Sequence, residues 1–322
     1  MKKILSLVLA LMLLLSIGAT VSAEGEEFKV GILSIDQAIE AYASISGYFE
    51  DYAEEAGWIC TTVSCDYDLA TQLTQMENFV AADYDVVMIF QPADPEGILS
   101  GVEEAMEAGV FVISYGTPIN GGNSELICDN YNAFYELGTQ VVNWCDANNN
   151  GEGEFALIYG ELNSESAWDR YNGVMDALKE HIDSGKIKIV GEQVTQTHDD
   201  AMTITETFLT QYPDLDGVIS TSGGGGTGAN EAIRAAGLLG ECYVFACDTT
   251  SDVLNILRSD SCAYYCTMCV GSDTYMASKL FEMCEVVKNG EGDTLEESYV
   301  APYQVVTPEN VEEYIEQWGL NV

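Results

Sequence analysis

The chain has 322 residues, of which 53 are acidic and 11 basic, and its formal net charge at pH 7 is −42. Nucleic acids and anionic membrane surfaces are bound by cationic patches, so this charge excludes both as expected partners. The hydrophobic content of 47% argues against intrinsic disorder and predicts a folded, soluble protein that is long enough for two domains.

Residues 1–23 have the pattern of a secretory signal peptide. Two lysines are followed by an apolar run, Ile4 to Ile17, and by a V-x-A cleavage site that ends at Ala23. The apolar run is shorter than the roughly 18 residues expected of a membrane-spanning helix, so cleavage rather than anchoring is predicted. No cysteine precedes Cys60, which leaves no lipobox cysteine for a lipid anchor. The predicted mature protein begins at Glu24 and is exported, to the periplasm or to the outer face of the cell membrane.

Apolar strand patterns and amphipathic helix patterns alternate along the rest of the chain. In the first half, strands are predicted at residues 28–35, 58–64, 86–90, 110–114 and 127–129, and helices at 37–56, 68–82, 95–108 and 131–147. After a turn-rich break at 148–153, strands are predicted at 154–159, 187–193, 217–220 and 243–246, and helices at 165–181, 199–211 and 275–288. Each half is therefore predicted to be a parallel sheet with helices on both faces, which gives an α/β fold with two doubly wound lobes.

Residues 215–248 form a predicted strand–loop–helix–strand unit whose loop contains four glycines, Gly223 to Gly226. This run and Gly228 fit the pattern G-x-G-x-x-G, and Asp248 follows Gly228 by twenty residues. The spacing is that of a dinucleotide-binding fingerprint, so a dinucleotide-dependent enzyme is one hypothesis. The competing hypothesis is a solute-binding lobe in which the glycine loop and Asp248 line a cleft. Export disfavours the first hypothesis, because the exterior of a cell does not normally supply the NAD that such enzymes need.

Cysteines are numerous for a chain of this size. They stand at positions 60, 65, 128, 145, 242, 247, 262, 266, 269 and 284. Their even number permits disulfides in an exported protein, but several lie within strand patterns as small core residues, and no pairing is predicted. Cys262, Cys266 and Cys269 have a C-x-x-x-C-x-x-C spacing that some iron–sulfur enzymes use. Their β-branched and aromatic surroundings favour structural cysteines instead.

Residues suited to catalysis are scarce. The two histidines, His181 and His198, have no sequence neighbour that suggests a nucleophile or a metal pair. No P-loop lysine and no serine elbow pattern is present in the sequence. The sequence therefore predicts a binding protein without a catalytic site, metal or cofactor.

The residues that follow the predicted strands are the candidate binding site, because ligands of open α/β sheets bind at the carboxyl ends of the strands. Two sheets whose carboxyl edges face each other would enclose a mainly apolar and aromatic cleft with a few polar groups. The residues predicted there are Asp36, Gln37, Tyr42, Gln91, Asp94, Tyr115, Trp168, Ser222, Gly223 and Asp248. Asp248 could instead cap the helix that begins near Ser251, and the aromatic residues among them could be packing residues.

Several segments occur in an order and spacing that together indicate a family. They are KVGILSI, TQMENFVAADYDVVMIFQPAD, EEAMEAGVFVISYG, CDNYNAFYELGTQVV, DRYNGVMDAL, TQYPDLDGVIS and ACDTTSDVLNIL. From Phe28 to Val306 the chain resembles the ribose-binding-protein-like (type I periplasmic) solute-binding proteins of ABC transporters. The resemblance implies two lobes joined by a three-crossover hinge, with crossovers near residues 129–131, 268–271 and 299–303. The first lobe would comprise residues 28–130 and about 271–300, and the second residues 131–270 and about 302–322.

The resemblance also implies a function. Proteins of this kind capture a small solute, here a sugar or sugar-like molecule, by closing the hinge, and present it to the permease of an ABC transporter. A sensory protein that presents the same ligand to a membrane receptor is the alternative, since both would use the same cleft.

Some site residues match the resemblance directly. Asp248 matches the acid that bonds sugar hydroxyls, and Asp36, Gln37 and Tyr42 fall where the family stacks an aromatic side chain on the ligand. Arg170 matches the second arginine of an R-x-R-x-x-G pattern, where a structural role is expected.

Other positions depart from the family pattern. Trp168 stands at the first arginine of the same pattern, and Tyr115 stands at the aspartate of an Asp-Arg pair. Ser222 and Gly223 replace an Asn-Asp pair, and Met268 or Cys269 replaces a glutamine. Because aromatic and small residues have replaced polar partners, a flatter or less hydroxylated solute is predicted.

Overall fold

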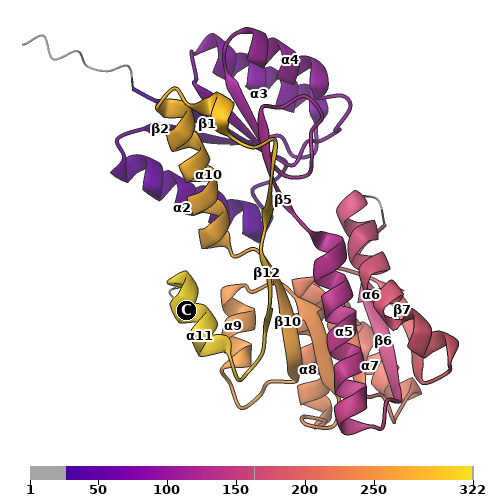
Figure 1. The fold of residues 1–322 in the computed structure, drawn as a ribbon. Helices are drawn as coiled ribbons and strands as arrows, with labels where there is room; N and C mark the ends of the chain where they lie inside the picture. The colour runs from indigo at the N-terminus through magenta and orange to yellow at the C-terminus, as the bar shows by residue number, and fades with distance from the viewer. Residues whose placement is uncertain (1–26, 163, 321–322) are drawn as a thin grey trace, which may run out of the picture.

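The computed structural model describes residues 27–162 and 164–320, so the predicted signal peptide at 1–23 lies outside the described residues. Within these two ranges the chain forms two α/β lobes, one above the other in Figure 1, each built on a six-stranded sheet. No helix in this part of the chain is both long enough and apolar enough to cross a membrane.

The first lobe has the strand order β11-β5-β4-β3-β1-β2, and its neighbouring strands run parallel. The strands are β1 (Lys29–Ser34), β2 (Ile59–Ser64), β3 (Val86–Phe90), β4 (Phe111–Gly116), β5 (Ser124–Cys128) and β11 (Ser298–Ala301). Helices α2 (Glu40–Glu55) and α10 (Asp273–Lys288) cover one face, and α3 (Leu69–Ala81) and α4 (Leu99–Glu107) cover the other. A short 3-10 turn, η1 (Gly292–Thr294), precedes β11. Every residue of β3 is buried, as expected of a strand covered on both faces.

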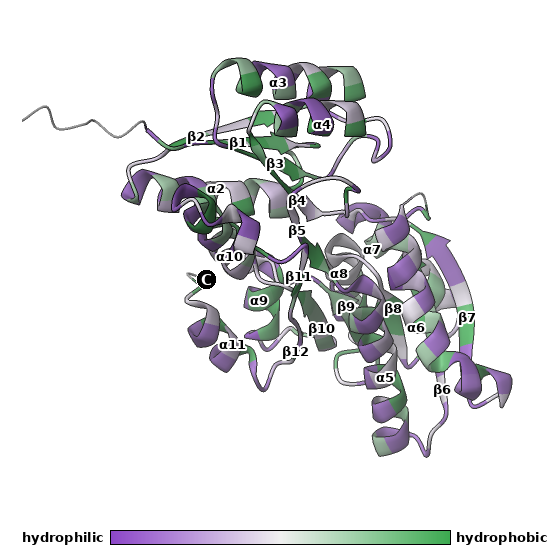
Figure 2. Cartoon of the chain, turned by 45° about the horizontal axis from the view of Figure 1, so that its top comes forward, coloured by the Kyte–Doolittle hydropathy of each residue, from purple (hydrophilic) through white to green (hydrophobic). Residues whose placement is uncertain are grey.

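The second lobe has the strand order β12-β10-β9-β8-β6-β7. The strands are β6 (Gly153–Tyr159), β7 (Ile187–Val194), β8 (Gly217–Ser220), β9 (Tyr243–Cys247), β10 (Tyr264–Val270) and β12 (Tyr303–Val306). Helices α5 (Asn130–Asn148) and α6 (Glu165–Asp183) cover one face. The other face carries α7 (His198–Gln211), α8 (Gly223–Ala236), α9 (Ser251–Leu257) and α11 (Val311–Trp318). Figure 2 shows the hydrophobic colour concentrated in central strands such as β8 and β9, while the outer surfaces of the helices are hydrophilic.

In the described residues the chain passes three times between the sheets: from β5 to α5, from β10 to α10, and from β11 to β12. These passages lie side by side at the centre of Figure 1. The predicted fold class, two parallel-sheet lobes joined by three crossovers, is confirmed. One strand departs from the parallel pattern, because β12 pairs antiparallel with β10 after a short connection from β11.

The glycine run was expected to be a loop and instead forms the first turn of α8. The helix begins there because the Ser222 hydroxyl accepts a hydrogen bond from the Gly225 N–H at 3.1 Å. The glycines permit close packing against the start of α7. A Cβ atom on Gly224 would lie 2.2 Å from the Gln196 carbonyl oxygen, and one on Gly228 would lie 2.3 Å from that of His198.

The C-x-x-x-C-x-x-C residues do not converge. Cys266 belongs to the core beneath α5, whereas Cys269 belongs to the core on the opposite face of the sheet, with Cys262 packed against it. All ten cysteines lie in the described ranges and are free thiols. No cluster of His, Cys, Asp and Glu side chains suited to a metal ion occurs among the residues that the structure describes.

Candidate functional site

Asp248 lies at the carboxyl edge of the second sheet. It follows β9 with a φ of +70°, and its carboxylate accepts a hydrogen bond from the Gly223 N–H at 2.9 Å. A negative charge at this place is favourable, because the amino terminus of α8 carries partial positive charge. Helix α9 is capped by Thr250, so Asp248 does not cap that helix.

The hydrogen bond between the Gly223 N–H and Asp248 argues against the dinucleotide hypothesis. In a dinucleotide site the amino terminus of the glycine-rich helix receives a pyrophosphate. Here the Asp248 carboxylate occupies the first N–H of α8 and would repel a phosphate group. The arrangement suits an uncharged ligand whose hydroxyl groups donate to the free lone pairs of the carboxylate.

Arg170 contacts Cys247, the residue before Asp248, with 3.8 Å between Nη1 and Sγ, and it is held by α5 and by the residue after β8. Its Nε donates to Asn130 Oδ1 at 2.9 Å and its Nη1 to the Thr221 carbonyl at 3.2 Å, and the guanidinium lies over the Phe134 ring, 5.1 Å from its centre. Burial acts to lower the pKa of Arg170, but the neighbouring acidic groups of Cys247 and Asp248 outweigh it, and the pKa is raised. Within the described residues Nη2 donates no hydrogen bond, which leaves one guanidinium nitrogen for a ligand.

Three residues at the carboxyl edge of the first sheet contact one another. The Tyr42 hydroxyl donates to Gln91 Oε1 at 2.5 Å, and the Gln91 N–H donates to the Tyr115 carbonyl at 3.2 Å. The Tyr42 and Tyr115 rings meet edge to face, with their centres 6.1 Å apart. Gln91 has a φ of +60°, a strained conformation for a residue other than glycine and one that often marks a functional site.

Electrostatic effects connect the two lobes. Burial raises the pKa of both Tyr42 and Tyr115, so both phenols stay protonated, and the proton of Tyr42 is donated to Gln91. The Arg170 guanidinium opposes that increase in the pKa of each tyrosine, and it does the same for the Cys128 thiol. Tyr42 and Tyr115 of the first lobe therefore lie within electrostatic range of Arg170, which in turn contacts Cys247, the residue before Asp248.

Several predicted site residues form hydrogen bonds near their own position in the sequence and do not contact this group. Asp36 accepts a hydrogen bond from the Ala38 N–H at 2.8 Å, and Gln37 donates to the Ser46 hydroxyl at 3.4 Å. Asp94 is exposed and accepts from the N–H groups of the turn before α4. These contacts shape the loops around the site and leave these three side chains outside the contacting group.

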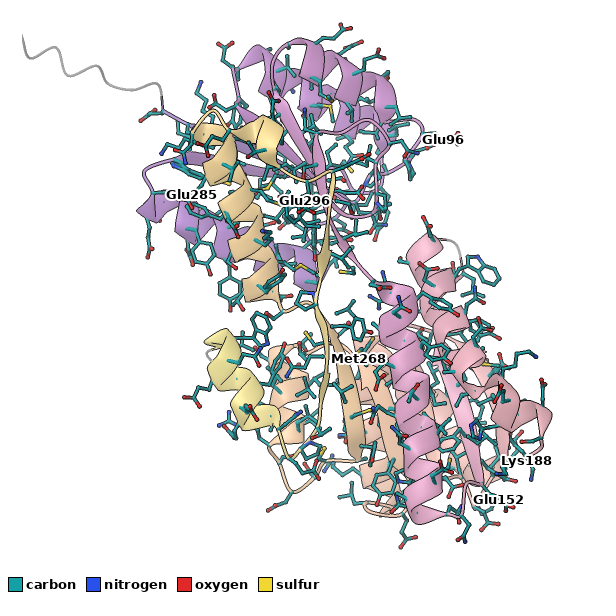
Figure 3. The ribbon with its side chains drawn as sticks, in the orientation of Figure 1. Glu96, Glu152, Lys188, Met268, Glu285 and Glu296 are labelled. Atoms are coloured by element: carbon teal, nitrogen blue, oxygen red, sulfur yellow. The ribbon has the colours of Figure 1, made fainter. Side chains whose placement is uncertain are left out.

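Met268 was predicted to line the site, and its side chain does not. It lies on β10 between Cys247 of β9 and Val305 of β12, and its side chain is fully buried in the core beneath α5. The alternation of strand side chains turns position 268 toward that core. Figure 3 labels Met268 on this strand. Only its carbonyl supports the site, by accepting a hydrogen bond from the Asp248 N–H at 2.9 Å.

Trp168 is an exposed aromatic residue of the second lobe. It lies in the first turn of α6, 47% of its surface is exposed, and its ring meets the Tyr171 ring edge to face at 6.4 Å. An exposed indole at a sheet edge can cover the C–H face of a sugar ring.

The sequence patterns did not identify Asn130, Thr221 and Cys128 as site residues. Asn130 and the Thr221 carbonyl hold Arg170, and the Cys128 thiol donates to the Val270 carbonyl at 3.3 Å, joining two of the passages between the lobes. Asn130 directly follows the strand predicted at residues 127–129, and this position was the signal that could have indicated it.

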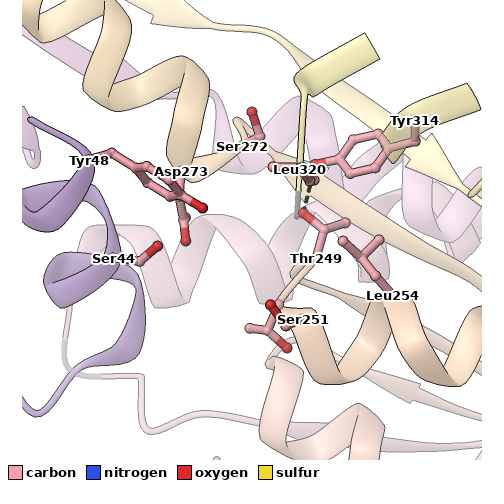
Figure 4. A pocket seen from close by; sticks show the side chains of 10 residues that line it. Ser44, Tyr48, Thr249, Ser251, Leu254, Ser272, Asp273, Tyr314 and Leu320 are labelled. Atoms are coloured by element: carbon pink, nitrogen blue, oxygen red, sulfur yellow. Dashed lines mark hydrogen bonds between the residues drawn. The ribbon is translucent and has the colours of Figure 1, made fainter. Parts of the chain in front are cut away.

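A small cavity lies between α2 of the first lobe and the second lobe. Its volume is about 60 Å³, and Figure 4 shows the Thr249 and Tyr314 hydroxyls hydrogen-bonded across it, at 2.8 Å. It is lined by Ser44, Tyr48, Thr249, Thr250, Ser251, Leu254, Ser272, Asp273, Tyr314 and Leu320. Ligand pockets have volumes of roughly 300 Å³ or more, so this cavity is too small for a sugar.

Comparison with known proteins agrees with this geometry. A family model described as "Periplasmic binding protein domain" matches residues 30–291. The D-xylose-binding periplasmic protein of Escherichia coli (strain K12) is 28% identical over 243 residues, which cover 74% of this chain and 71% of that protein. The xylitol-binding protein of Mycolicibacterium smegmatis is 23% identical over 301 residues, which cover 92% of this chain and 81% of that protein.

Solved structures share the fold. A periplasmic solute-binding protein of an ABC transporter from Actinobacillus succinogenes 130z, with bound D-allose, superposes with a TM-score of 0.75 at 20% identity, over 89% of this chain and 100% of that one. The Caulobacter myo-inositol-binding protein, bound to myo-inositol, superposes with a TM-score of 0.73 at 22% identity, over 91% and 98%. The family match extends across both lobes and two of the three passages between them. The chain therefore belongs to the periplasmic binding protein family and is a solute-binding protein rather than an enzyme.

Proposed function

We propose that this protein captures a sugar or a sugar-like solute between its lobes and delivers it to the permease of an ABC transporter. The observation that carries the proposal is the group formed by Tyr42 and Tyr115 of the first lobe with Arg170 and Asp248 of the second. Relatives named for D-xylose, xylitol, and D-ribose and D-allose support a sugar or a polyol as the solute.

The chemistry of this group suits a neutral solute with hydroxyl groups. The Asp248 carboxylate accepts hydrogen bonds from hydroxyl groups, and the free nitrogen of Arg170 donates one to a ring or hydroxyl oxygen. Trp168 supplies an aromatic surface for the C–H face of the solute. The net charge of −42 repels anionic solutes, which favours an uncharged ligand over a sugar phosphate.

The position of the protein in the cell follows from the same proposal. The signal-like residues 1–23 direct export, and the mature protein works in the periplasm or at the outer face of the membrane, where a permease receives the solute. We assign residues 28–130 and about 271–300 to one moving lobe, and residues 131–270 and about 302–322 to the other. Binding then closes the lobes about the passages between the sheets.

A thermal-shift screen of the mature protein tests the proposal. The panel contains D-xylose, D-ribose, D-allose, xylitol, myo-inositol, amino acids and NAD. A solute at about 100 times its Kd stabilises the folded state by about 2.7 kcal/mol, which raises the melting temperature measurably. A shift with a sugar or polyol is expected. A shift with NAD alone, or with amino acids alone, would contradict the proposal.

A further inference from the structure

Tyr67 adopts a backbone conformation that disfavours its side chain. It lies in the turn after β2, where Asp66 and Tyr67 have φ values of +50° and +63°. Bulky residues at positive φ are uncommon, and glycine or asparagine adopts this conformation with less strain. The turn is held by main-chain bonds, from the Tyr67 N–H to the Ile35 carbonyl at 3.1 Å and from the Asp68 N–H to the Cys65 carbonyl at 2.9 Å. The turn therefore does not require a tyrosine side chain.

The Tyr67 ring also contributes little to packing. It is 61% exposed, more than any other large hydrophobic side chain in residues 27–162 and 164–320. Within these ranges its ring has no aromatic neighbour and its hydroxyl forms no hydrogen bond. An exposed ring on a strained backbone lowers stability without a compensating contact, and such residues occur where function requires them.

The ring lies at the carboxyl edge of the first sheet, near the group described above. Burial and then the nearby Asp36 carboxylate raise the pKa of Tyr67, and Tyr67 is itself among the groups that raise the pKa of Tyr42, after burial and Cys128. Strand β2 is the edge strand farthest from β5 and β11, which carry the passages to the second lobe. Tyr67 therefore lies at the end of the site that is remote from these passages.

Trp168 has the corresponding place in the second lobe. It is 47% exposed on α6, which follows β6, and β6 neighbours the edge strand β7. We propose that Tyr67 contacts the bound solute from the first lobe, at the end of the site away from the passages, while Trp168 contacts it from the second. This inference rests on the proposed function. It also narrows the solute class, because two aromatic faces select a ring with an apolar C–H face, a pyranose or a cyclitol, over a linear polyol.

Titration calorimetry and thermal unfolding of Tyr67 variants test this inference. The probes are D-xylose, D-allose and myo-inositol, with xylitol as the linear counterpart. Tyr67→Gly is expected to raise the melting temperature while the Kd of the best cyclic probe rises about five- to tenfold. Tyr67→Asn, which tolerates the same backbone conformation, is a second variant with the same expected loss. Tyr67→Phe keeps the ring, and its Kd is expected to stay within about twofold of the wild-type value.

Tyr135→Ala is the matched control, since this tyrosine is 44% exposed on α5 and has no place in the proposed contact. Unchanged binding in Tyr67→Gly and Tyr67→Asn would overturn the inference and leave the proposed function intact. A lower melting temperature in both variants would assign Tyr67 a structural role and also overturn it, as would tighter binding of xylitol than of every cyclic probe. If the wild-type protein bound none of the four probes, the proposed function and this inference would fail together.

Discussion

The Asp248 carboxylate and the Arg170 guanidinium are oriented by other groups of the second lobe rather than by each other. Asp248 is fixed by the Gly223 N–H, and Arg170 by Asn130 and the Thr221 carbonyl. Neither side chain has to be reorganised when a solute enters, so their polar atoms are preorganised for hydrogen bonds. The energetic effect of each residue on binding can therefore be tested by small substitutions that keep the side-chain shape.

Asp248→Asn removes the charge and one acceptor site while the shape is kept. Because hydrogen bonds to a charged group are worth about 1.5–3 kcal/mol, the Kd for the solute is expected to rise roughly ten- to hundredfold. Stability should change by no more than about 1 kcal/mol, the size of a charge–helix interaction. Calorimetric titration and urea unfolding measure the two effects.

Asp216→Asn is the matched control for that substitution. Asp216 also accepts a main-chain hydrogen bond, from the Glu154 N–H at 2.8 Å, but it precedes β8 at the opposite edge of the same sheet. Its substitution should leave the Kd unchanged. Equal weakening of binding in both variants would show that Asp248 acts through the fold and not through the solute.

Tyr42→Phe tests the first-lobe half of the group. It removes the hydroxyl whose proton goes to Gln91 at 2.5 Å and whose oxygen is left to accept a hydrogen bond from the solute. Loss of such a bond to the solute, about 1 kcal/mol, raises the Kd about fivefold. Tyr84→Phe is the control, because the Tyr84 hydroxyl bonds to Thr61 at 2.7 Å and the residue lies at the amino end of β3. Calorimetry should show weaker binding for the first variant alone, and unaltered binding in Tyr42→Phe would remove Tyr42 from the site.

At the scale of the element, helix α8 shows how glycines position the site. They let the amino end of the helix approach the start of α7, which places the Gly223 N–H against Asp248. Alanine is ordinarily the better helix former by about 1 kcal/mol. In α8, however, a side chain on Gly228 would meet the His198 carbonyl oxygen at 2.3 Å, and a main-chain atom cannot move aside easily.

Gly228→Ala is therefore expected to destabilise the protein by about 1–3 kcal/mol, the usual range for overpacking. Gly47→Ala is the counterpart, because a Cβ atom at position 47 in α2 meets nothing within 4 Å, and the protein should gain about 0.5–1 kcal/mol. Urea unfolding of both variants gives the comparison. If Gly228→Ala were as stable as Gly47→Ala, close packing would not explain the glycine run.

The sequence patterns predicted the order of the central strands and helices, because hydrophobic periodicity follows directly from burial on one or both faces. They could not predict that the glycines begin a helix, since the close approach of α7 is a tertiary contact. They also did not identify β12 as antiparallel, which depends on how the chain returns from β11.

Some of the site residues could likewise be predicted from the sequence, and others could not. Asp248 and Gln91 could be predicted because they directly follow strands. Met268 was misplaced because one register position separates the core face of a strand from its other face. Asn130 was missed because its partner, Arg170, is 40 residues away in the sequence.

At the scale of the whole molecule, buried thiols make stability depend on pH. Burial raises the pKa of Cys60 and of Cys242 to about 12, from an ordinary value of 9.0. Their contribution to stability is complete below about pH 9 and is lost as the pH rises toward 12, because the unfolded chain then releases protons that the folded chain retains. Each thiol changes the free energy of unfolding by at most about 1.4 kcal/mol per pH unit.

Urea unfolding between pH 8 and about pH 11 checks this dependence. Stability should fall with increasing pH in the wild-type protein and fall less steeply in the double variant Cys60→Ala, Cys242→Ala. Identical slopes would show that these two thiols are not responsible. Tyrosine and lysine titrate in the same range, and the double variant separates their effect from that of the cysteines.

The acidic surface extends over both lobes. Figure 3 labels exposed glutamates on the first lobe, Glu96, Glu285 and Glu296, and Glu152 on the second. With a net charge of −42, the lobes repel each other more strongly as they approach. A solute that bonds to both lobes would offset this repulsion on closure. Higher salt would screen the repulsion between the lobes.

We propose that one solute binds between the lobes and contacts both. The most direct measurement is a calorimetric titration of the mature protein, Glu24 to Val322, with D-xylose, D-allose and myo-inositol, repeated with Asp248→Asn and Tyr42→Phe. We expect saturable binding of one solute per chain for at least one probe. Both substitutions should weaken it, since the two residues belong to different lobes. Binding that is insensitive to either substitution, or no binding of any probe, would contradict the proposal.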